Sequence, residues 1–277
     1  MRPRLSGDER VRWQTITSLA GRLFVAIQKE KPPMFQDQRT NPYSADAVSF
    51  AQIEVRAAFI RRTYAHLMGA VLAFVFIETA LFTFIDIELR QRIIQTLFGS
   101  IWNWLGVMVA FMAVSWIAET WASSGASTQK QYLGLSLYVV AESLIFAPLL
   151  FFASMWSEDA IPAAAVISLS TFGGLTAIVF ITRSDLAGWS KYLYLAGFAG
   201  IGLIIVAIFT GGGGGFELLI SGFFVVLAGG FILYQTSNVL HHYREDQHVA
   251  ASLALFAALA MLFWWVLRIV LFLMNRD

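Results

Sequence analysis

Three glutamates lie within long apolar stretches of the sequence, where an ionisable side chain is costly. Glu78, Glu119 and Glu142 each follow an apolar residue and precede a threonine or a serine within such a stretch. Burying a charge at the centre of a bilayer costs at least ~2.5 kcal/mol, so such residues are functional candidates by default. Each glutamate is either a carboxylate that faces a polar cavity and takes up a proton or a cation, or a neutral carboxyl that hydrogen-bonds to a neighbouring helix. Glu142 lies nearest the middle of its stretch and is the leading candidate, whereas Glu119 is expected near an interface.

A cluster of hydrogen-bonding side chains ends another apolar stretch near the C-terminus. Lipid offers these groups no partners, so we expect them to face the interior of a helix bundle or its aqueous end. Their structural role there would be hydrogen bonding between helices, at about 0.6 kcal/mol per bond. The cluster consists of Tyr234, Gln235, Thr236, Ser237 and Asn238.

Signals of an enzyme or a metal site are weak in this chain. The nearest approach to a metal cluster is His241, His242 and His248 with Glu245 and Asp246 between them, and the spacing is not that of a zinc site. Neither a phosphate-binding loop nor a His-Glu-x-x-His or Gly-x-Ser-x-Gly motif occurs. The absence of cysteine excludes disulfides and thiolate ligands. We expect no enzymatic activity, no bound metal and no cofactor.

The composition indicates that most of the chain is embedded in lipid. Of its 277 residues 58% are hydrophobic and 13% are charged, against about 25% charged residues in soluble proteins. Eleven of the 19 Lys and Arg residues precede Tyr64, so the remainder is especially poor in charge. The net charge of +1 provides no basic surface for phosphates, which argues against a nucleic-acid partner.

Apolar length predicts an all-α polytopic membrane protein with seven transmembrane helices, because a bilayer core about 30 Å thick takes ~20 residues per helix. Six helices and a re-entrant last segment are the alternative. The pairs Gly173/Ala177 and Ala196/Gly200 are expected to allow close helix packing. The predicted spans are Tyr64–Phe84, Trp102–Ala122, Tyr132–Met155, Ile161–Thr182, Trp189–Phe209, Phe216–Leu240 and Val249–Met274.

The residues before the first span have a different character. We expect residues 1–44 to form a partly disordered cytoplasmic tail, residues 45–63 an interfacial amphipathic helix, and residues 64–277 the membrane domain. The start of the chain is rich in arginine and lacks the features of a signal peptide.

The distribution of basic residues predicts the orientation in the membrane. Arg56, Arg61 and Arg62 stand directly before the first span, and basic residues near a span favour the cytoplasmic side. With seven spans the N-terminus is then cytoplasmic and the C-terminus outside. Four further basic residues fall on the cytoplasmic side in this arrangement: Lys130, Arg183, Lys191 and Arg244.

Several motifs in order along the chain resemble the Bax inhibitor family. The resemblance covers about residues 56–274 and includes the polar cluster, which is similar to that family's tyrosine–aspartate–threonine–serine–asparagine signature. The other matching runs are Phe59–Ala70, Glu142–Leu150, Thr171–Thr176, Thr182–Asp185 with Arg183 in it, and Leu262–Arg268.

The resemblance implies helices bundled around a hydrophobic last helix and a pH-sensitive calcium leak. We therefore expect the chain to lie in the cell inner membrane, and bacterial members of the family have been linked to modulation of a membrane-bound AAA protease. The family's leak is gated by two aspartates between the last two spans, and two close carboxylates share a proton. Here Gln235 and Ala258 occupy those positions, and Met261 replaces the asparagine that follows. The resemblance therefore implies the fold but not this gating mechanism.

Two classes of function remain open. The first is a leak for Ca²⁺ or H⁺ that uses other carboxylates, with Glu142 and Glu78 as the leading candidates. The second is a non-conducting membrane protein whose tail and cytoplasmic loops bind a partner such as the AAA protease. Loss of both aspartates favours the second class, and the glutamates within the spans favour the first.

Overall fold

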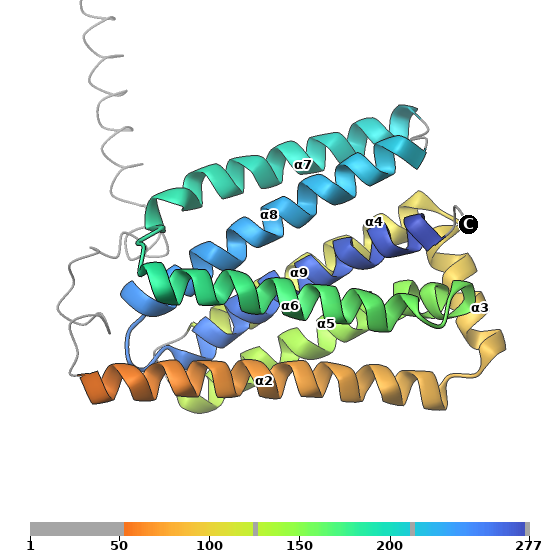
Figure 1. The fold of residues 1–277 in the computed structure, drawn as a ribbon. Helices are drawn as coiled ribbons and strands as arrows, with labels where there is room; N and C mark the ends of the chain where they lie inside the picture. Colours follow the sequence, from red (N-terminus) through yellow and green to blue (C-terminus); the bar gives the residue numbers. More distant parts are fainter. Residues whose placement is uncertain (1–52, 124–126, 211–213, 275–277) are drawn as a thin grey trace, which may run out of the picture. The chain divides into compact units, whose positions relative to one another are not determined.

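The structure, a computed structural model, describes residues 53–123, 127–210 and 214–274 (Figure 1). These residues are almost entirely helical and contain no β-strand. A short 3₁₀ helix, η3 (Ala187–Trp189), precedes α7. The α-helices are α2 (Ile53–Phe84), α3 (Ile87–Phe98), α4 (Ile101–Ala122), α5 (Thr128–Trp156), α6 (Ala160–Thr182), α7 (Ser190–Thr210), α8 (Gly214–His241) and α9 (His248–Met274).

Seven helices of the described chain are long and apolar enough to cross a membrane, namely α2 and α4 to α9. The predicted all-α polytopic class is therefore confirmed. Helix α2 begins at Ile53 and continues through Tyr64 without a break. The described part of the expected interfacial segment therefore belongs to the same helix as the first span. The expected tail, residues 1–44, lies outside the described residues.

Helix α3, between the first and second spans, was not predicted. Its 12 residues are too short to cross a bilayer, and they mix apolar with charged side chains. The carboxylate of Asp86 starts the helix by accepting a hydrogen bond from the backbone N–H of Leu89 at 2.8 Å. Arg90 then reaches back to the end of α2, where its guanidinium donates to the backbone carbonyls of Ile85 and Phe82.

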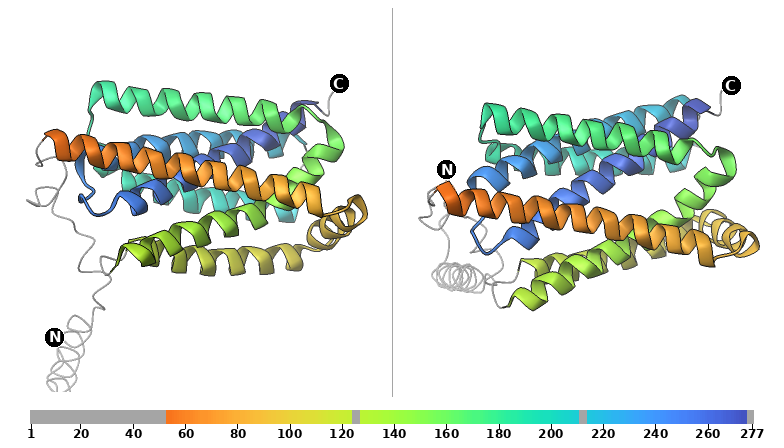
Figure 2. Two further views of the ribbon diagram at one scale, coloured as in Figure 1. Left: turned by 90° about the horizontal axis from the view of Figure 1, so that it is seen from below. Right: turned by 60° about the horizontal axis from the view of Figure 1, so that its bottom comes forward.

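Helix α9 lies in the middle of the bundle, as the resemblance implied. It packs against α2, α4, α5, α6 and α8, and Figure 2 shows the dark blue ribbon enclosed by the others from two further directions. Helix α5 is also strongly buried, with fifteen buried residues along its 29. Helix α7 packs on the outer side of α8. The core therefore forms around α9 and α5.

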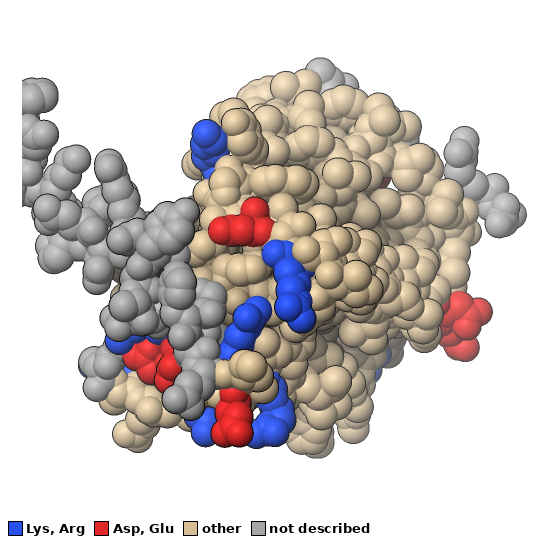
Figure 3. Space-filling view, turned by 60° about the vertical axis from the view of Figure 1, so that its left-hand side comes forward, with Lys and Arg blue, Asp and Glu red and all other residues tan. Residues whose placement is uncertain are grey.

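Successive spans alternate in direction, so the bundle has two distinct ends. We call the end where α8 meets α9 the α8–α9 end, and the end where α3 lies the α3 end (Figure 1). Figure 3 looks onto the α8–α9 end, where charged side chains gather on an otherwise largely uncharged surface. Arg183, Lys191 and Arg244 belong to this end, on which α6 and α8 stop and α7 starts. Which end faces the cytoplasm stays a prediction.

Close backbone approach occurs at a glycine that the sequence analysis did not select. A Cβ atom at Gly134 of α5 would lie 2.5 Å from the carbonyl oxygen of Ala118 on α4. The prediction of close packing is wrong for Gly173, where an added Cβ would meet nothing within 4 Å. It holds for Gly200, where the Cβ would lie 2.5 Å from the ring of Phe224.

Candidate functional site

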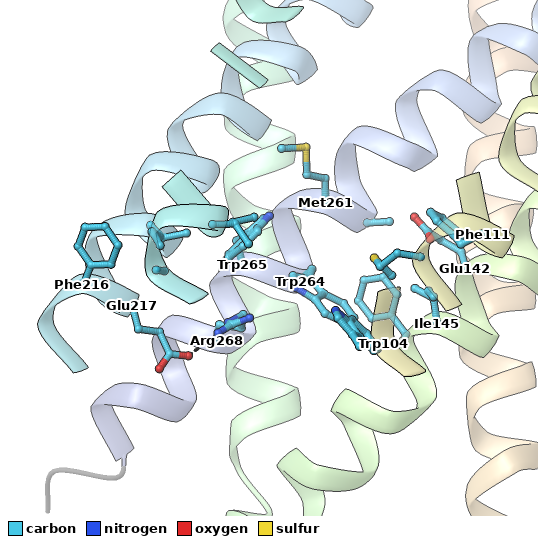
Figure 4. A pocket seen from close by; sticks show the side chains of 16 residues that line it. Trp104, Phe111, Glu142, Ile145, Phe216, Glu217, Met261, Trp264, Trp265 and Arg268 are labelled. Atoms are coloured by element: carbon cyan, nitrogen blue, oxygen red, sulfur yellow. Dashed lines mark hydrogen bonds and ion pairs between the residues drawn. The ribbon is translucent and has the colours of Figure 1, made fainter. Parts of the chain in front are cut away.

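Glu142 lies in the middle of α5 and lines a cavity of about 640 Å³, which we call the Glu142 cavity. Only 6% of the residue is exposed, and the hydroxyl of Tyr138, one turn earlier, lies within hydrogen-bonding reach of its carboxyl. Figure 4 shows this carboxyl among aromatic side chains. Helices α4, α5, α7, α8 and α9 contribute Trp104, Met108, Phe111, Glu142, Ile145, Phe146, Ile204, Ala207, Phe216, Glu217, Ile220, Ala260, Met261, Trp264, Trp265 and Arg268.

At the other end of this cavity, Arg268 and Glu217 neutralise each other's charge in an ion pair. Arg268 of α9 donates to the Glu217 carboxylate of α8 at 2.5 Å, and its guanidinium lies 5.4 Å from the ring centre of Trp265 (Figure 4). Glu217 is in the first turn of α8, so the pair belongs to the α3 end. The sequence analysis did not select Glu217, because a glutamate at the edge of a span is usually a solvated end residue.

Glu78 lines a second cavity of about 470 Å³ between α2, α6 and α9, which we call the Glu78 cavity. Its two carboxyl oxygens are buried and have no hydrogen-bond partner among the described residues. The same is true of the hydroxyl of Ser168, which lines the same cavity from α6. A buried polar group without a partner costs about 1–3 kcal/mol, so a ligand that bonded to these oxygens would relieve that cost.

Helix α9 separates the two carboxyls. Ala260 lines both cavities, one on each of its sides. Next to it the ring of Phe146, in the Glu142 cavity, stacks on Phe263, in the Glu78 cavity, with ring centres 5.7 Å apart. Phe74 of α2 packs edge-on against Phe146 at 5.3 Å. The structure therefore brings Glu78 and Glu142 to opposite sides of one aromatic wall rather than into a single site.

Buried polar side chains connect four helices between Glu142 and the α8–α9 end. Ser252 of α9 is fully buried, and its hydroxyl lies between two backbone carbonyl oxygens, that of Thr63 on α2 at 2.8 Å and that of His248 in its own helix at 2.6 Å. The hydroxyls of Tyr64, Thr176 and Thr236 lie close to one another without completing a hydrogen bond among the described residues. These buried contacts join α2, α6, α8 and α9 in the half of the bundle that the Glu142 cavity does not reach, where a third cavity of about 550 Å³ lies between α2 and α5.

The polar cluster of α8 makes two kinds of hydrogen bond, one to the linker between α6 and α7 and one within the helix. Ser237 fastens the linker between α6 and α7: its hydroxyl accepts from the backbone N–H of Leu186 at 2.8 Å and donates to the carbonyl of Ser184 at 3.1 Å. Asn238 donates to Gln235 within the helix at 3.3 Å. The predicted location, at the bundle interior near an aqueous end, agrees with these contacts.

The linker itself is shaped by the other predicted loop residues. Arg183 ends α6 in a left-handed conformation, with φ at 51°, and Asp185 accepts a hydrogen bond from His242 at 2.8 Å. Partial burial acts to raise the pKa of Asp185. The hydrogen bonds from His242 and from the backbone of Ala187, with the charges of His242 and His241, outweigh it and hold this pKa below its ordinary value.

Two further groups of predicted residues lie apart from the cavities. Glu119 is exposed in the last turn of α4, at the end of the span as expected. The three histidines have different surroundings: His242 bonds to Asp185, His241 to the carbonyl of Ser237, and His248 packs edge-on against His66 at 5.0 Å.

Comparisons with known proteins agree with the resemblance described above. The family described as "inhibitor of apoptosis-promoting Bax1" matches residues 56–277. The chain is also similar to a protein of Schizosaccharomyces pombe named Bax inhibitor 1. The two are 25% identical over 260 residues, which cover 90% of this chain and 87% of that protein.

Proposed function

This chain belongs to the Bax inhibitor family of multi-pass membrane proteins, and on that premise we propose that it provides a leak for Ca²⁺ or H⁺. The Glu142 cavity carries this proposal. It combines a mid-membrane carboxyl with a space that extends from the α3 end to the centre of the bundle. Mid-membrane ionisable residues are expensive and usually mark ion or proton pathways.

In the proposed leak the carboxyl of Glu142 takes up the cation at the bottom of the cavity. The half of the bundle beyond it is then the closed barrier, which must loosen before a cation can pass. The buried contact between Ser252 and Thr63 and the aromatic wall at Phe146 are the parts of that barrier nearest to the two carboxyls. Glu78 is the second candidate, because its unpartnered oxygens would gain a ligand from a cation.

The pH dependence of this leak is proposed to differ from that of the family. Gln235 and Ala258 carry no ionisable group, so they cannot share a proton in the way that two close carboxylates do. Gating by that pair is therefore absent, and any remaining pH dependence would come from the glutamates. We propose no enzymatic step.

Calcium flux through the full chain in reconstituted vesicles, measured at pH 6 and pH 8, tests the proposal. We expect flux above that of empty vesicles, and we expect any difference between the two values of pH to depend on the glutamates. Glu142→Gln should abolish the flux, because the amide keeps the shape and loses the charge. If flux is unchanged in Glu142→Gln but lost in Glu78→Gln, cations pass through the Glu78 cavity instead. No flux in the unmodified protein would contradict the leak.

The second candidate function is a non-conducting protein that binds and modulates another membrane protein, such as a membrane-bound protease. Two observations favour it: both gating aspartates are missing, and charged side chains gather at the α8–α9 end (Figure 3). Such a surface suits the charged rim of a partner. Cross-linking of the protein in its native membrane, compared with a variant in which Arg183 and Arg244 are replaced by Gln, would detect a partner that depends on this end.

A further inference from the structure

The Glu142 cavity holds an acidic group that has no basic partner among the described residues. Three of its lining residues are ionisable: Glu142, Glu217 and Arg268. Arg268 and Glu217 form an ion pair with each other, and no salt bridge joins Glu142 to a basic side chain among the described residues. The cavity therefore holds one acidic group in excess, at its deep end, and is complementary to a ligand with a single positive charge.

The remaining wall of the cavity is apolar and aromatic. Trp104 stacks against Trp264 with ring centres 6.1 Å apart, and Trp264 packs edge-on against Phe146 at 5.0 Å. Phe111 lies beside Glu142 (Figure 4), and Met261 lines the cavity from α9. Aromatic faces attract a cation, most strongly where the site is desolvated, and apolar walls bury the carbon skeleton of a ligand.

The side chains that line this cavity are poor ligands for a metal ion that has lost its water. Ca²⁺ takes six to eight oxygen ligands, whereas among the lining residues only Glu142 and Glu217 carry side-chain oxygens. A metal ion in this cavity would have to keep most of its water. An ammonium group needs few acceptors and can bring its own apolar skeleton, which the tryptophans and phenylalanines would cover.

We infer that the Glu142 cavity is a binding site for a compact apolar amine, whose ammonium group lies at the Glu142 carboxyl and whose skeleton packs against Trp104, Phe146 and Trp264. A volume of about 640 Å³ is within the 300–1,000 Å³ typical of small-molecule sites. This site shares Glu142 with the proposed leak but does not require conduction. If the leak exists, the amine occupies its deep end and blocks it.

The test measures binding, not flux. The full chain in phosphatidylcholine nanodiscs is titrated by calorimetry with 1-adamantylamine and with 1-adamantanol, which has the same shape and no charge. We expect saturable binding of the amine, at least about tenfold tighter than that of the alcohol, or ~1.4 kcal/mol. Equal binding of the two compounds would mean an apolar cavity of the kind that a lipid chain fills, and would overturn the inference. So would heats no larger than those of empty nanodiscs.

Variants locate the site. Glu142→Gln should weaken amine binding about tenfold and leave alcohol binding unchanged. Glu78→Gln is the matched control, since it makes the same change at a buried carboxyl in the other cavity, and it should leave amine binding unchanged. The inference fails if Glu78→Gln removes the binding and Glu142→Gln does not.

Ala207→Trp, on the α7 wall of the cavity, keeps both carboxyls and should exclude the amine by filling its space. Because these titrations need no conduction, amine binding without flux would contradict the leak alone, and flux without amine binding would contradict this inference alone.

Discussion

The imidazole Nε2 of His242 lies 2.8 Å from Oδ1 of Asp185, so the loop between α8 and α9 is tied directly to the linker between α6 and α7. Ser237 binds the backbone of the same linker on both sides of Asp185, at Ser184 and Leu186. Two of the motifs that resemble the family, Thr182–Asp185 and Tyr234–Asn238, therefore meet in one structural unit at the α8–α9 end.

Replacing Asp185 by asparagine should lower stability in a pH-dependent way. Because the pKa of Asp185 in the folded protein lies below its ordinary value, its contribution is complete above that value, about 3.9. The contribution is lost as the pH falls through the folded-state pKa. Half of the side chain is exposed, so solvent limits the effect to about 1 kcal/mol or less.

Apparent unfolding midpoints of the protein and of Asp185→Asn, measured between pH 6 and pH 3, check this. The two midpoints should differ at pH 6 and converge toward pH 3. Asp159→Asn serves as a control, because the Asp159 side chain makes no capping hydrogen bond. A difference that grows on acidification would contradict the assignment.

Gly134→Ala should destabilise the bundle by about 1–3 kcal/mol, the usual range for overpacking. The added Cβ would lie 2.5 Å and 2.6 Å from backbone atoms of Ala118 and Ala122, and backbone atoms cannot turn away as a side chain can. Gly173→Ala is the matched control: it has open space around it and should be neutral or raise stability by up to ~1 kcal/mol. Denaturant titration in detergent compares the two, and equal stabilities would show that α4 and α5 are not in close contact at Gly134.

Gln235→Asp combined with Ala258→Asp should introduce pH dependence if these are the family's aspartate positions. Two carboxyls that share a proton titrate closer to neutral pH than an isolated one. The measurement is flux, or the unfolding midpoint if the protein does not conduct, at pH 6 and pH 8, with Gln235→Asp alone as the control.

The geometry behind this double variant can be checked separately. The chain has no cysteine, so Gln235→Cys with Ala258→Cys provides a single thiol pair, which should react with a cross-linker of about 8 Å reach. Absence of both cross-linking and pH dependence would show that the alignment of the last helix is wrong.

A reporter fused after Asp277 should be active on the outer side of the membrane. The seven spans place the two ends of the chain on opposite sides, and Arg56, Arg61 and Arg62 favour a cytoplasmic start. Fusions after Arg244 and after Gly212 serve as controls, because the predicted topology puts the first on the cytoplasmic side and the second outside. Activity on the cytoplasmic side would mean that the whole bundle is inverted or that the last segment does not cross.

The length of the apolar runs was enough to predict the seven spans, whereas the direction in which each side chain points was not predictable. In a helix that is apolar on all sides, as α5 nearly is around Glu142, no periodic pattern marks a face. The sequence could therefore not show that Glu142 and Glu78 line two different cavities. The ion pair of Arg268 was also not predictable, because its partner Glu217 lies 51 residues away in the sequence. Contacts of this kind depend on tertiary packing alone.

The contacts at the two ends of α2 differ in strength, and this difference has a mechanical consequence. At the α3 end the charged guanidinium of Arg90 binds the last carbonyls of the helix. Toward the α8–α9 end, neutral hydrogen bonds from Ser252 to Thr63 and between His66 and Tyr132 hold it. Charge-assisted bonds are roughly twice as strong as neutral ones. The α3 end of α2 is therefore held by the stronger hydrogen bonds, whereas the other half is held by the packing of Phe59, Leu67 and Ala70. Pulling the helix out of the bundle would therefore break different kinds of contact at its two ends.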